Sequence, residues 1–406
     1  MYMLLLMPIR IPTIFVVLAL FMVSFSSAQK IERVLSNEKE NIYVVGFSPD
    51  GKTIATAGGR DSVADMWEVS TGQKLGTLFK DRDANATARG PKSRVLITKI
   101  SWPVLIEFSR NWEKVATYNI DEKIVRVWDV KNGSLKATIN ETKKDFGIRF
   151  ALDPKNRLIA TTVFDEFVVN TWNEETGGLE ATLEHPRHKQ FRYANGVREL
   201  AFTPDGRSLV TTSFREVYIW DIASGMIKAK LIDPDVILWE GFKAHKGFSH
   251  GDSIYVLRVS PDGRFAATGS RDGTAKIWDL QTRELKFTLK GHKGKVHRLG
   301  FSPDSGTLIT GSYDKTAKLW NVETGEMKAS LPHRGTVWAV SFSPDSELAA
   351  TASDNEKKVN LWNSATGKLV AGLEGARDPF AFSPDGKTLA TGSDKNAVLI
   401  WKVPDK

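Results

Sequence analysis

Residues 291–325 read GHKGKVHRLGFSPDSGTLITGSYDKTAKLWNVETG and form the unit that the rest of the chain repeats. The unit and the residues just before it contain four short runs rich in apolar and β-branched residues, separated by turn formers such as the SPDSG cluster. Short runs of this kind with tight turns between them predict four antiparallel strands. The runs lie at residues 285–289, 295–301, 307–311 and 316–320.

The unit begins with Gly291-His292 and ends with Trp320-Asn321. Four-stranded units of roughly 40 to 45 residues with these marks resemble the WD-repeat (WD40) β-propeller family. The resemblance implies that a His, a Ser, an Asp and a Trp form a hydrogen-bonded tetrad in each blade. By alignment, the tetrad of this unit is His292, Ser312, Asp314 and Trp320. Each group would cost about 1 to 3 kcal/mol if it were buried without a partner, so the tetrad is expected to stabilise its blade.

The unit recurs along the chain, and a tryptophan marks the third strand of each repeat. The turn between the first and second strands reads FSPDG at residues 47–51 and 382–386, with close variants in other repeats. We interpret these FSPDG repeats as the bacterial type of the family. The third-strand tryptophans are Trp67, Trp128, Trp172, Trp220, Trp278, Trp320, Trp362 and Trp401.

An outer strand precedes each set of three inner strands, and the chain ends soon after Trp401. The run at residues 31–35 is therefore left to supply the outer strand of the last blade. Such closure removes an open sheet edge that would otherwise promote aggregation. The sequence predicts an all-β fold over residues 29–406, with no second domain: one eight-bladed propeller of four-stranded antiparallel blades, closed by the N-terminal outer strand.

The predicted tetrads differ in completeness. We expect complete sets in blades 5, 6 and 7, and we interpret their histidines as structural groups, not catalytic ones. Blade 8 keeps Ser393 and Asp394 without a histidine, and blades 1 to 4 keep at most acidic candidates such as Asp61, Asp121 and Asp165. The sets beside that of blade 6 are His250, Ser270, Asp272 and Trp278 in blade 5, and His333, Ser353, Asp354 and Trp362 in blade 7.

Residues 1–28 differ from the repeats. Arg10 precedes the apolar run 14–23, and small residues end the segment at Ala28. This pattern predicts a signal peptide that is cleaved after Ala28, and hence a periplasmic or secreted protein. The alternative is an uncleaved membrane anchor formed by residues 1–25. Prolines and an arginine interrupt that segment and leave an apolar run shorter than the span of about 20 residues that a membrane requires, which favours cleavage.

The chain contains no cysteine, which excludes disulfides and a disulfide-linked oligomer. Exported proteins that lack disulfides are consistent with a bacterial source. The formal net charge is +8, and it becomes about +7 once Arg10 is removed with the signal peptide. An exported protein rarely meets nucleic acid. We therefore expect weak attraction to anionic envelope polymers and no nucleic-acid partner.

The family resemblance implies that partner proteins contact side chains just after the GH turn and just before the tetrad Asp. At the first position lie Tyr43, Arg198, Tyr255, His297, Trp338 and Asp378, and at the second lie Arg60, Arg271 and Tyr313. Tyr, Trp and Arg are enriched at binding hot spots, and several of these residues fall in the adjacent blades 5 to 7. The competing interpretation is a scatter of surface aromatics, which is normal in β proteins. The predicted partner-binding residues are Tyr43, Arg60, Tyr255, Arg271, His297, Tyr313 and Trp338.

Three long insertions, at residues 80–103, 184–196 and 232–251, fall in loops that lead from an outer strand to the next first strand. They should extend from the same face of the propeller, either as interaction loops or as tolerated insertions. His185 and His188 lie in the second insertion. Two histidines without further ligands do not define a metal site, so no metal is predicted.

No HExxH, GxSxG or phosphate-binding loop is present. The sequence predicts a protein without enzymatic activity or cofactor, which acts as a scaffold for a protein partner. The alternative is a propeller enzyme of hydrolase or lactonase type, or a small-ligand binder, that uses the central channel. Carboxylates or histidines that converge in the channel would favour the alternative, and an exposed aromatic patch beside an apolar channel would favour the scaffold.

Overall fold

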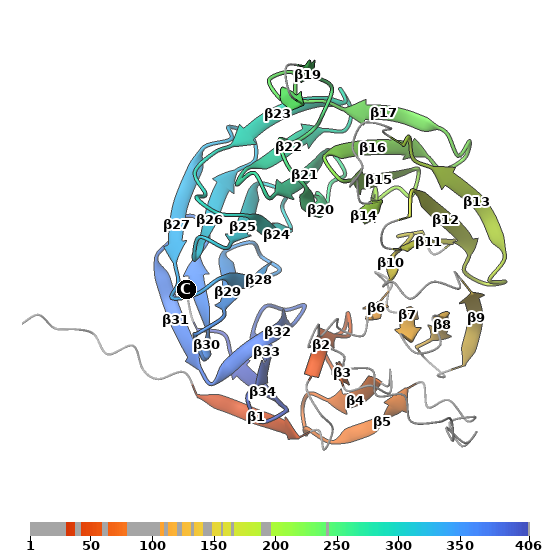
Figure 1. The fold of residues 1–406 in the computed structure, drawn as a ribbon. Coiled ribbons are helices and arrows are strands. Elements are labelled where there is room, and N and C mark those ends of the chain that lie inside the picture. The colour runs from red at the N-terminus through yellow and green to blue at the C-terminus, as the bar shows by residue number, and fades with distance from the viewer. Residues whose placement is uncertain are drawn as a thin grey trace, which may run out of the picture.

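The computed structural model describes residues 30–36, 42–58, 64–78, 106–108, 113–119, 124–130, 134–140, 148–155, 157–163, 166–187, 196–240 and 243–404. These residues form eight four-stranded antiparallel sheets and one two-stranded hairpin, without a helix. The sheets stand as blades around a central axis (Figure 1). The predicted all-β, eight-bladed propeller is confirmed.

Each blade runs from an innermost to an outermost strand. The first four blades contain β2 (Ile42–Phe47), β3 (Thr53–Gly58), β4 (Ala64–Glu68) and β5 (Lys74–Leu78); β6 (Ile106–Phe108), β7 (Lys114–Asn119), β8 (Ile124–Asp129) and β9 (Leu135–Asn140); β10 (Ile148–Leu152), β11 (Leu158–Val163), β12 (Val168–Asn173) and β13 (Leu179–Glu184); and β14 (Val197–Phe202), β15 (Ser208–Ser213), β16 (Glu216–Asp221) and β17 (Ile227–Leu231).

The next three blades contain β20 (Ile254–Val259), β21 (Phe265–Ser270), β22 (Ala275–Asp279) and β23 (Glu284–Leu289); β24 (Val296–Phe301), β25 (Thr307–Ser312), β26 (Thr316–Asn321) and β27 (Met327–Pro332); and β28 (Val337–Phe342), β29 (Leu348–Ser353), β30 (Lys358–Asn363) and β31 (Leu369–Glu374). Blade 8 joins β32 (Ala376–Phe382), β33 (Thr388–Ser393) and β34 (Ala397–Lys402) to the N-terminal strand β1 (Ile31–Ser36).

Strand β1 closes the ring by pairing with β34 in antiparallel register, from Ile31 opposite Trp401 to Ser36 opposite Ala397. Figure 1 shows β1 beside β34 at the outer edge of this blade. Leu35 is buried and packs with Val398 and other core residues of blades 8 and 1. The predicted closure by the N-terminal outer strand is therefore confirmed.

One detail of the expected unit is wrong. The run at residues 285–289 lies in β23, which pairs with β22 and completes blade 5. Blade 6 is completed instead by β27, which follows its third strand. The sequence repeat therefore spans two blades, because the chain crosses from the outer edge of one sheet to the inner strand of the next.

The core lies between blades. One cluster joins Ile309 and Leu319 of blade 6 to Val337, Phe342 and Trp362 of blade 7, and comparable clusters join other neighbouring blades. A buried tryptophan covers about 150 to 250 Å², which corresponds to roughly 4 to 6 kcal/mol of apolar transfer free energy before entropy is subtracted. This packing supplies a stiff frame for the loops.

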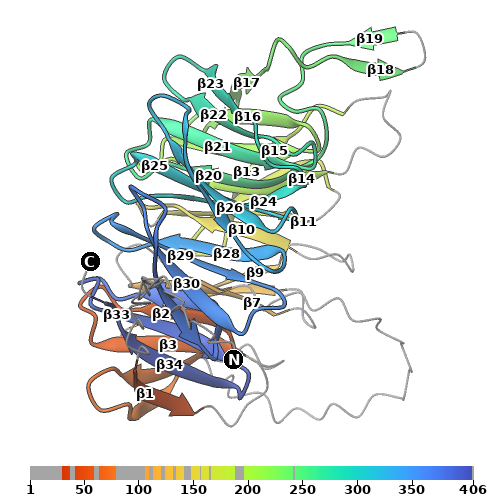
Figure 2. The same ribbon diagram turned by 90° about the vertical axis from the view of Figure 1, so that its left-hand side faces the viewer.

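The third insertion, residues 232–251, contains a hairpin of β18 (Leu238–Glu240) and β19 (Lys243–His245). Figures 1 and 2 show this hairpin projecting away from the ring. Residues 1–28 and 80–103 lie outside the described residues, as do residues 188–195 of the second insertion. No helix that could span a membrane occurs in the described part of the chain.

Candidate functional site

The loops that carry the predicted partner-binding residues meet at one end of each blade. In blade 6, Val296 at the start of β24 pairs with Ser312 at the end of β25. The loop before the first strand and the turn after the second strand therefore lie together, and His297 lies near Tyr313. The FSPDG-type turn lies at the opposite end of the sheet, where Phe301 pairs with Leu308. We call the first end the loop face.

A tryptophan and a threonine form the same hydrogen bond in all eight blades. The indole N–H of the third strand donates to a hydroxyl on the second strand at 2.7–2.9 Å. The acceptors are Thr56, Thr117, Thr161, Thr211, Thr268, Thr310, Thr351 and Thr391, in blade order.

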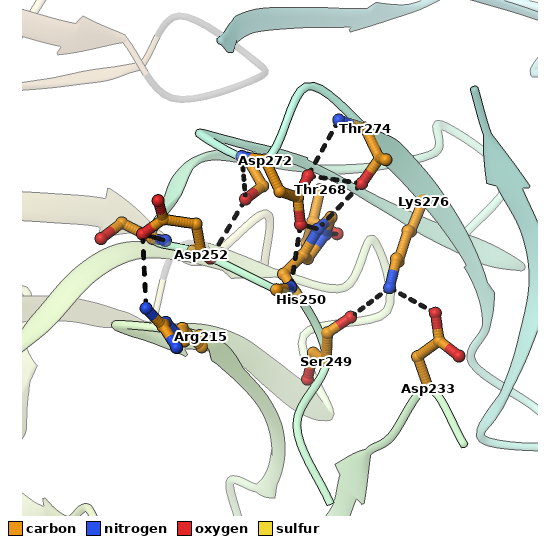
Figure 3. Close-up of polar contacts among 12 residues, drawn as sticks. Arg215, Asp233, Ser249, His250, Asp252, Thr268, Asp272, Thr274 and Lys276 are labelled. Atoms are coloured by element: carbon orange, nitrogen blue, oxygen red, sulfur yellow. Dashed lines mark hydrogen bonds and ion pairs between the residues drawn. The ribbon is translucent and has the colours of Figure 1, made fainter. Parts of the chain in front are cut away.

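In blade 5 the chain of hydrogen bonds continues through His250 (Figure 3). The Nε2 atom of His250 lies 2.7 Å from the Thr268 hydroxyl, and its Nδ1 atom lies 3.1 Å from Asp272. Burial alone would raise the pKa of the Asp272 carboxyl, but the hydrogen bonds with His250 and Thr274 outweigh burial and hold it far below its usual range. The acid is therefore ionised and bonded inward, which suits a structural role.

Blade 6 repeats this arrangement, with His292 Nε2 at 2.6 Å from Thr310 and Nδ1 at 2.8 Å from Asp314. In blade 7, His333 contacts Thr351 at 3.0 Å and the carboxylate of Glu356 at 2.7 Å. The three histidines lie in these linked sets, but the three serines and the acid of blade 7 differ from the expectation.

The predicted serines do not join the histidine to the tryptophan. Ser270 donates instead to the backbone carbonyl of Asp252, and Ser312 donates to that of Gly294. The linking threonine lies two residues earlier on the same face of the strand, because side chains at i and i+2 point the same way. In blade 7, Ser353 bonds the Glu356 carboxylate at 2.6 Å.

The acid of blade 7 is Glu356 and not Asp354, because the turn is longer and places Glu356 over the histidine. In blade 8, Ser393 donates to the carbonyl of Ala397, and Asp394 pairs with Lys357 and Arg377. Asp61, Asp121 and Asp165 lie outside the described residues.

Blade 4 also contains a histidine, His185, which was predicted to lie in the second insertion. His185 is 3% exposed, and its Nε2 atom lies 3.0 Å from the Thr211 hydroxyl that also accepts from Trp220. Its Nδ1 atom has no hydrogen bond within the described residues. Burial lowers the pKa of His185 to about 3, so the ring is neutral. His185 directly follows the outer strand β13, as His333 directly follows β27. This shared position in the sequence could have identified His185 as a tetrad histidine.

Three of the predicted partner-binding side chains form one contiguous group, which we call the aromatic cluster: His297, Tyr313 and Trp338. The His297 ring lies 4.7 Å from Tyr313 and 4.6 Å from Trp338 between ring centroids, and the last two are 5.5 Å apart. All three contacts are edge-to-face, a favourable arrangement for such rings. Tyr313 is 44% exposed and His297 only 5%.

His297 is buried and polar, yet neither ring nitrogen has a hydrogen bond within the described residues. Burial, assisted by the charge of Arg298 and opposed by a smaller effect of the Lys295 backbone, lowers the pKa of His297 to about 4. The ring is therefore neutral at pH 7. A buried imidazole without partners is costly, which makes the cluster a plausible place for a ligand to donate or accept.

Two cations border the cluster. The Nζ atom of Lys295 lies 5.2 Å from the Tyr313 ring centroid, and the Arg298 guanidinium carbon lies 5.6 Å from that of Trp338. Arg298 also donates from Nε to the Trp338 carbonyl at 2.6 Å and from Nη1 to the His297 carbonyl at 2.9 Å. These bonds tie blades 6 and 7 together beneath the cluster.

The other predicted residues lie apart from the cluster. Tyr255 is covered by Arg198, whose guanidinium carbon lies 5.3 Å from the ring centroid. Arg271 lies 3.7 Å from the carboxylate of Asp252. Asp252 also forms an ion pair with Arg215 at 3.7 Å (Figure 3). Tyr43 lies on β2, but its side chain and all of Arg60 lie outside the described residues.

The base of the third insertion is held by a buried ion pair. Lys276 on β22 pairs with Asp233 and donates to the backbone carbonyl of Ser249 at 2.7 Å (Figure 3). Both charged side chains are almost fully buried. The insertion is therefore anchored at both of its ends, while its hairpin projects from the ring.

One carboxylate lies among arginines on the inner strands around the central axis. Glu199 on β14 lies 3.6 Å from Arg149 and 3.9 Å from Arg258. Burial raises the pKa of Glu199 against the opposing charges of Arg258 and Arg149, and burial likewise raises that of Asp378 against Arg298. No group of three or more His, Cys, Asp or Glu side chains suited to a metal occurs in the described residues. In the described part of the inner strands, the ionisable groups are thus a carboxylate paired with arginines and not a converging set of acids and histidines.

A pocket of about 530 Å³ opens on the loop face beside Trp338, between blades 7 and 8. Its lining mixes both signs of charge, including Glu356 of the blade 7 tetrad and Lys357. The aromatic cluster thus borders a concave surface. The remaining lining residues are Ala352, Ser353, Asp354, Asn355, Arg377 and Asp378.

The repeats match a known family model, described as "WD domain, G-beta repeat", at residues 29–68, 242–279, 283–321, 325–363 and 380–402. The chain contains WD40 repeats. The matched stretches include the sequence of the aromatic cluster in blades 6 and 7. WD40 propellers are typical of protein-interaction scaffolds, and WD40 proteins bind protein partners.

Curated relatives include proteins of plants and fungi. The chain is 23% identical to "Autophagy-related protein 16" of Arabidopsis thaliana over half of this chain and 47% of that protein. It is 30% identical to "Nuclear distribution protein nudF" of Aspergillus niger, over 43% of this chain and 41% of that one. It is 34% identical to "Small ribosomal subunit protein RACK1y" of Oryza sativa, over 52% and 66%. The chain thus spans less than two thirds of the length of these relatives.

Among solved structures, the computationally designed Ika8 protein superimposes with a TM-score of 0.66. The match covers 91% of this chain and 98% of the designed chain at 20% identity. Such a likeness supports the propeller fold alone.

Proposed function

We propose that the chain is an exported, non-catalytic WD40 scaffold that binds a protein partner through the loop face of blades 5 to 7. The observation that carries the proposal is the aromatic cluster, in which an exposed Tyr313 and a half-buried Trp338 cover His297. Among the described residues, the ring nitrogens of His297 have no hydrogen-bond partner. Aromatic side chains held by a rigid frame are typical hot spots, because little side-chain entropy is lost on binding.

The absence of catalysis is supported by how the ionisable side chains are used. His250, His292 and His333 are each bonded on both ring nitrogens. Glu199 in the channel is flanked by arginines, which differs from the pair of carboxylates that glycoside hydrolysis uses.

Export is supported by the segment before Gln29, with its arginine, apolar run and small residues. A mature protein whose N-terminal residue is Gln29, identified by intact mass, would support cleavage. Retention of residues 1–28 in a membrane fraction would support the anchor instead. The bacterial type of the repeats, suggested by the FSPDG turns, stays a prediction beside relatives from plants and fungi.

The binding face is tested by affinity capture from the envelope and secreted fractions of the source with residues 29–406. The variant is the triple substitution Tyr255→Ala, His297→Ala, Trp338→Ala. The matched control is Leu179→Ala, Met327→Ala, Leu369→Ala, which removes exposed apolar side chains from outer strands. A partner that binds the parent and the control but not the loop-face variant supports the proposal, provided that all three proteins melt alike.

Retention of the same partner by the loop-face variant would move the binding site to the insertions. Capture of no partner by any of the three proteins would favour a small ligand in the channel.

A further inference from the structure

Blade 6 differs from its neighbours in how its surface cations are used. On blade 5, Arg271 pairs with Asp252, and on blade 7 Lys357 pairs with Asp394. In blade 6, Lys293 and Lys295 lie in the loop before β24, and Lys315 lies in the turn after β25, two residues from Tyr313. Within the described residues none of the three has an ion pair. This group of lysines, together with the aromatic cluster, is called the basic aromatic patch below.

The carboxylate nearest to these lysines in the chain is already engaged. Asp314 is almost buried, and its oxygens bond His292 and the hydroxyl of Thr316 at 2.8 and 2.7 Å. It also accepts the backbone N–H of Lys293 at 2.9 Å. Asp314 therefore holds the loop through buried hydrogen bonds and does not neutralise the three lysine side chains.

The two loops that carry the lysines are held rigidly against each other. The backbone N–H of Tyr313 donates to the Lys295 carbonyl at 3.0 Å. Between the first two lysines, Gly294 approaches so closely that an added Cβ would lie 2.9 Å from the Asp314 nitrogen. The positions of the lysine backbones are thus set before any partner arrives, which lowers the entropic cost of binding.

Positive charge continues from the patch toward the channel. Arg298 lies beneath Trp338, where it bonds backbone carbonyls, and within the described residues it forms no ion pair with a carboxylate. Arg258 and Arg149 follow on neighbouring inner strands and share Glu199. The pocket beside Trp338 carries both signs of charge, so the excess of unpaired cations is centred on the three lysines of blade 6.

We infer that the partner contacts the basic aromatic patch with an acidic peptide segment. Its carboxylates pair with Lys293, Lys295 and Lys315, and its chain lies across Tyr313 and Trp338. This inference rests on the proposed function and adds the chemical class of the partner. Opposite charges across an interface raise the association rate and reject partners of the wrong sign, whereas the aromatic rings supply the apolar contact.

The inference is tested by fluorescence anisotropy with a labelled deca-glutamate peptide, compared with an uncharged Gly/Ser peptide and a deca-lysine peptide of equal length. The variant is Lys293→Gln, Lys295→Gln, Lys315→Gln. The matched control, Lys155→Gln, Lys228→Gln, Lys368→Gln, removes the same charge from exposed lysines away from the loop face. We expect the acidic peptide to bind selectively and to bind the patch variant about tenfold more weakly than the control.

Equal weakening in the patch and control variants would overturn the inference, because binding would then follow net charge alone. The inference would also be overturned if deca-glutamate did not bind, or if the uncharged peptide bound equally well. A third contradicting outcome is that an anionic polysaccharide such as polygalacturonate competes more strongly than deca-glutamate for the protein.

The two proposals fail separately. If the natural partner is captured by the lysine variant but lost with the Tyr255, His297 and Trp338 variant, the loop-face proposal stands and the acidic peptide is wrong. If both variants retain the partner, the loop face itself is wrong.

Discussion

At the scale of single residues, the linking threonine is the group on which each blade depends. Thr310 accepts the Trp320 indole at 2.9 Å and contacts His292 at 2.6 Å, so one hydroxyl satisfies two buried groups. Ser312, two residues later, bonds the backbone of the neighbouring loop. The two positions should therefore respond differently to loss of the hydroxyl.

We expect Thr310→Val to lower the free energy of unfolding by about 1 to 3 kcal/mol, because it leaves the indole N–H and the imidazole nitrogen buried without a partner. Ser312→Ala should cost less, since the groups that it releases lie nearer the surface. Urea denaturation of the parent and of both variants measures the two losses of unfolding free energy. An equal or larger loss for Ser312→Ala would contradict the assignment of Thr310 as the link.

His185 predicts a dependence of stability on pH. The folded protein keeps this ring neutral down to about pH 3, whereas the unfolded chain binds a proton near the ordinary value of 6.5. The unfolded state therefore binds more protons below pH 6.5, so the free energy of unfolding falls as the pH decreases from 6.5 toward 3.

We expect His185→Gln to flatten that decrease by up to about 1.4 kcal/mol per pH unit, which is the contribution of one proton. Denaturant titrations at several pH values between 4 and 7 measure the slope. A slope as steep as that of the parent protein would show that His185 takes up its proton without unfolding.

At the scale of elements, the third insertion depends on the buried pair of Lys276 and Asp233. Lys318 is the equivalent residue on β26 of blade 6, where its Nζ atom bonds the Ser330 hydroxyl at 3.0 Å. The loop that leads into blade 6, between β23 and β24, contains no such insertion. Comparing substitutions of Lys276 and Lys318 therefore distinguishes loss of the insertion's anchor from loss of any lysine on a third strand.

Lys276→Met should detach the base of the insertion, because removing one member of a buried ion pair costs about 3 to 5 kcal/mol and detachment lets water reach Asp233. Limited trypsin digestion should then cut faster after Lys243 or Lys246. Lys318→Met is the control and should leave the cleavage rate unchanged. Equal cleavage of parent and Lys276→Met protein would contradict the anchoring role.

At the scale of the whole molecule, closure of the ring depends on β1, which comes from the other end of the sequence from β34. Leu35 is 1% exposed in the core of this blade, whereas the adjacent Val34 is 54% exposed. Deleting β1 would expose the backbone edge of β34, and exposed edges promote pairing with other chains.

We expect deletion of residues 30–36 from the mature protein to cause aggregation or a strong fall in Tm. Leu35→Ala should lower the free energy of unfolding by about 2 to 5 kcal/mol through lost packing. Val34→Ala should change it by no more than about 0.5 kcal/mol, because this side chain is exposed. Light scattering and thermal melts provide the measurements. A deletion variant that stays monomeric with the Tm of the parent would show that the ring is stable without β1.

The sequence by itself determined the architecture. Regular turns, third-strand tryptophans and a missing last outer strand predicted eight blades and their closure, because each signal lies within a few residues of a strand. It also selected His297, Tyr313 and Trp338 as surface candidates, since their positions relative to the GH turn and the tetrad acid are local features.

Only the tertiary structure decided which of these residues act together. The choice of Thr310 over Ser312 depends on which of two hydroxyls on one strand face lies beside an indole from the next strand. The contact of His297 with Trp338, and the pairing of Arg271 with Asp252, depend on how loops meet in space. Such contacts arise from packing between segments that are distant in the chain, so no local pattern of residues encodes them.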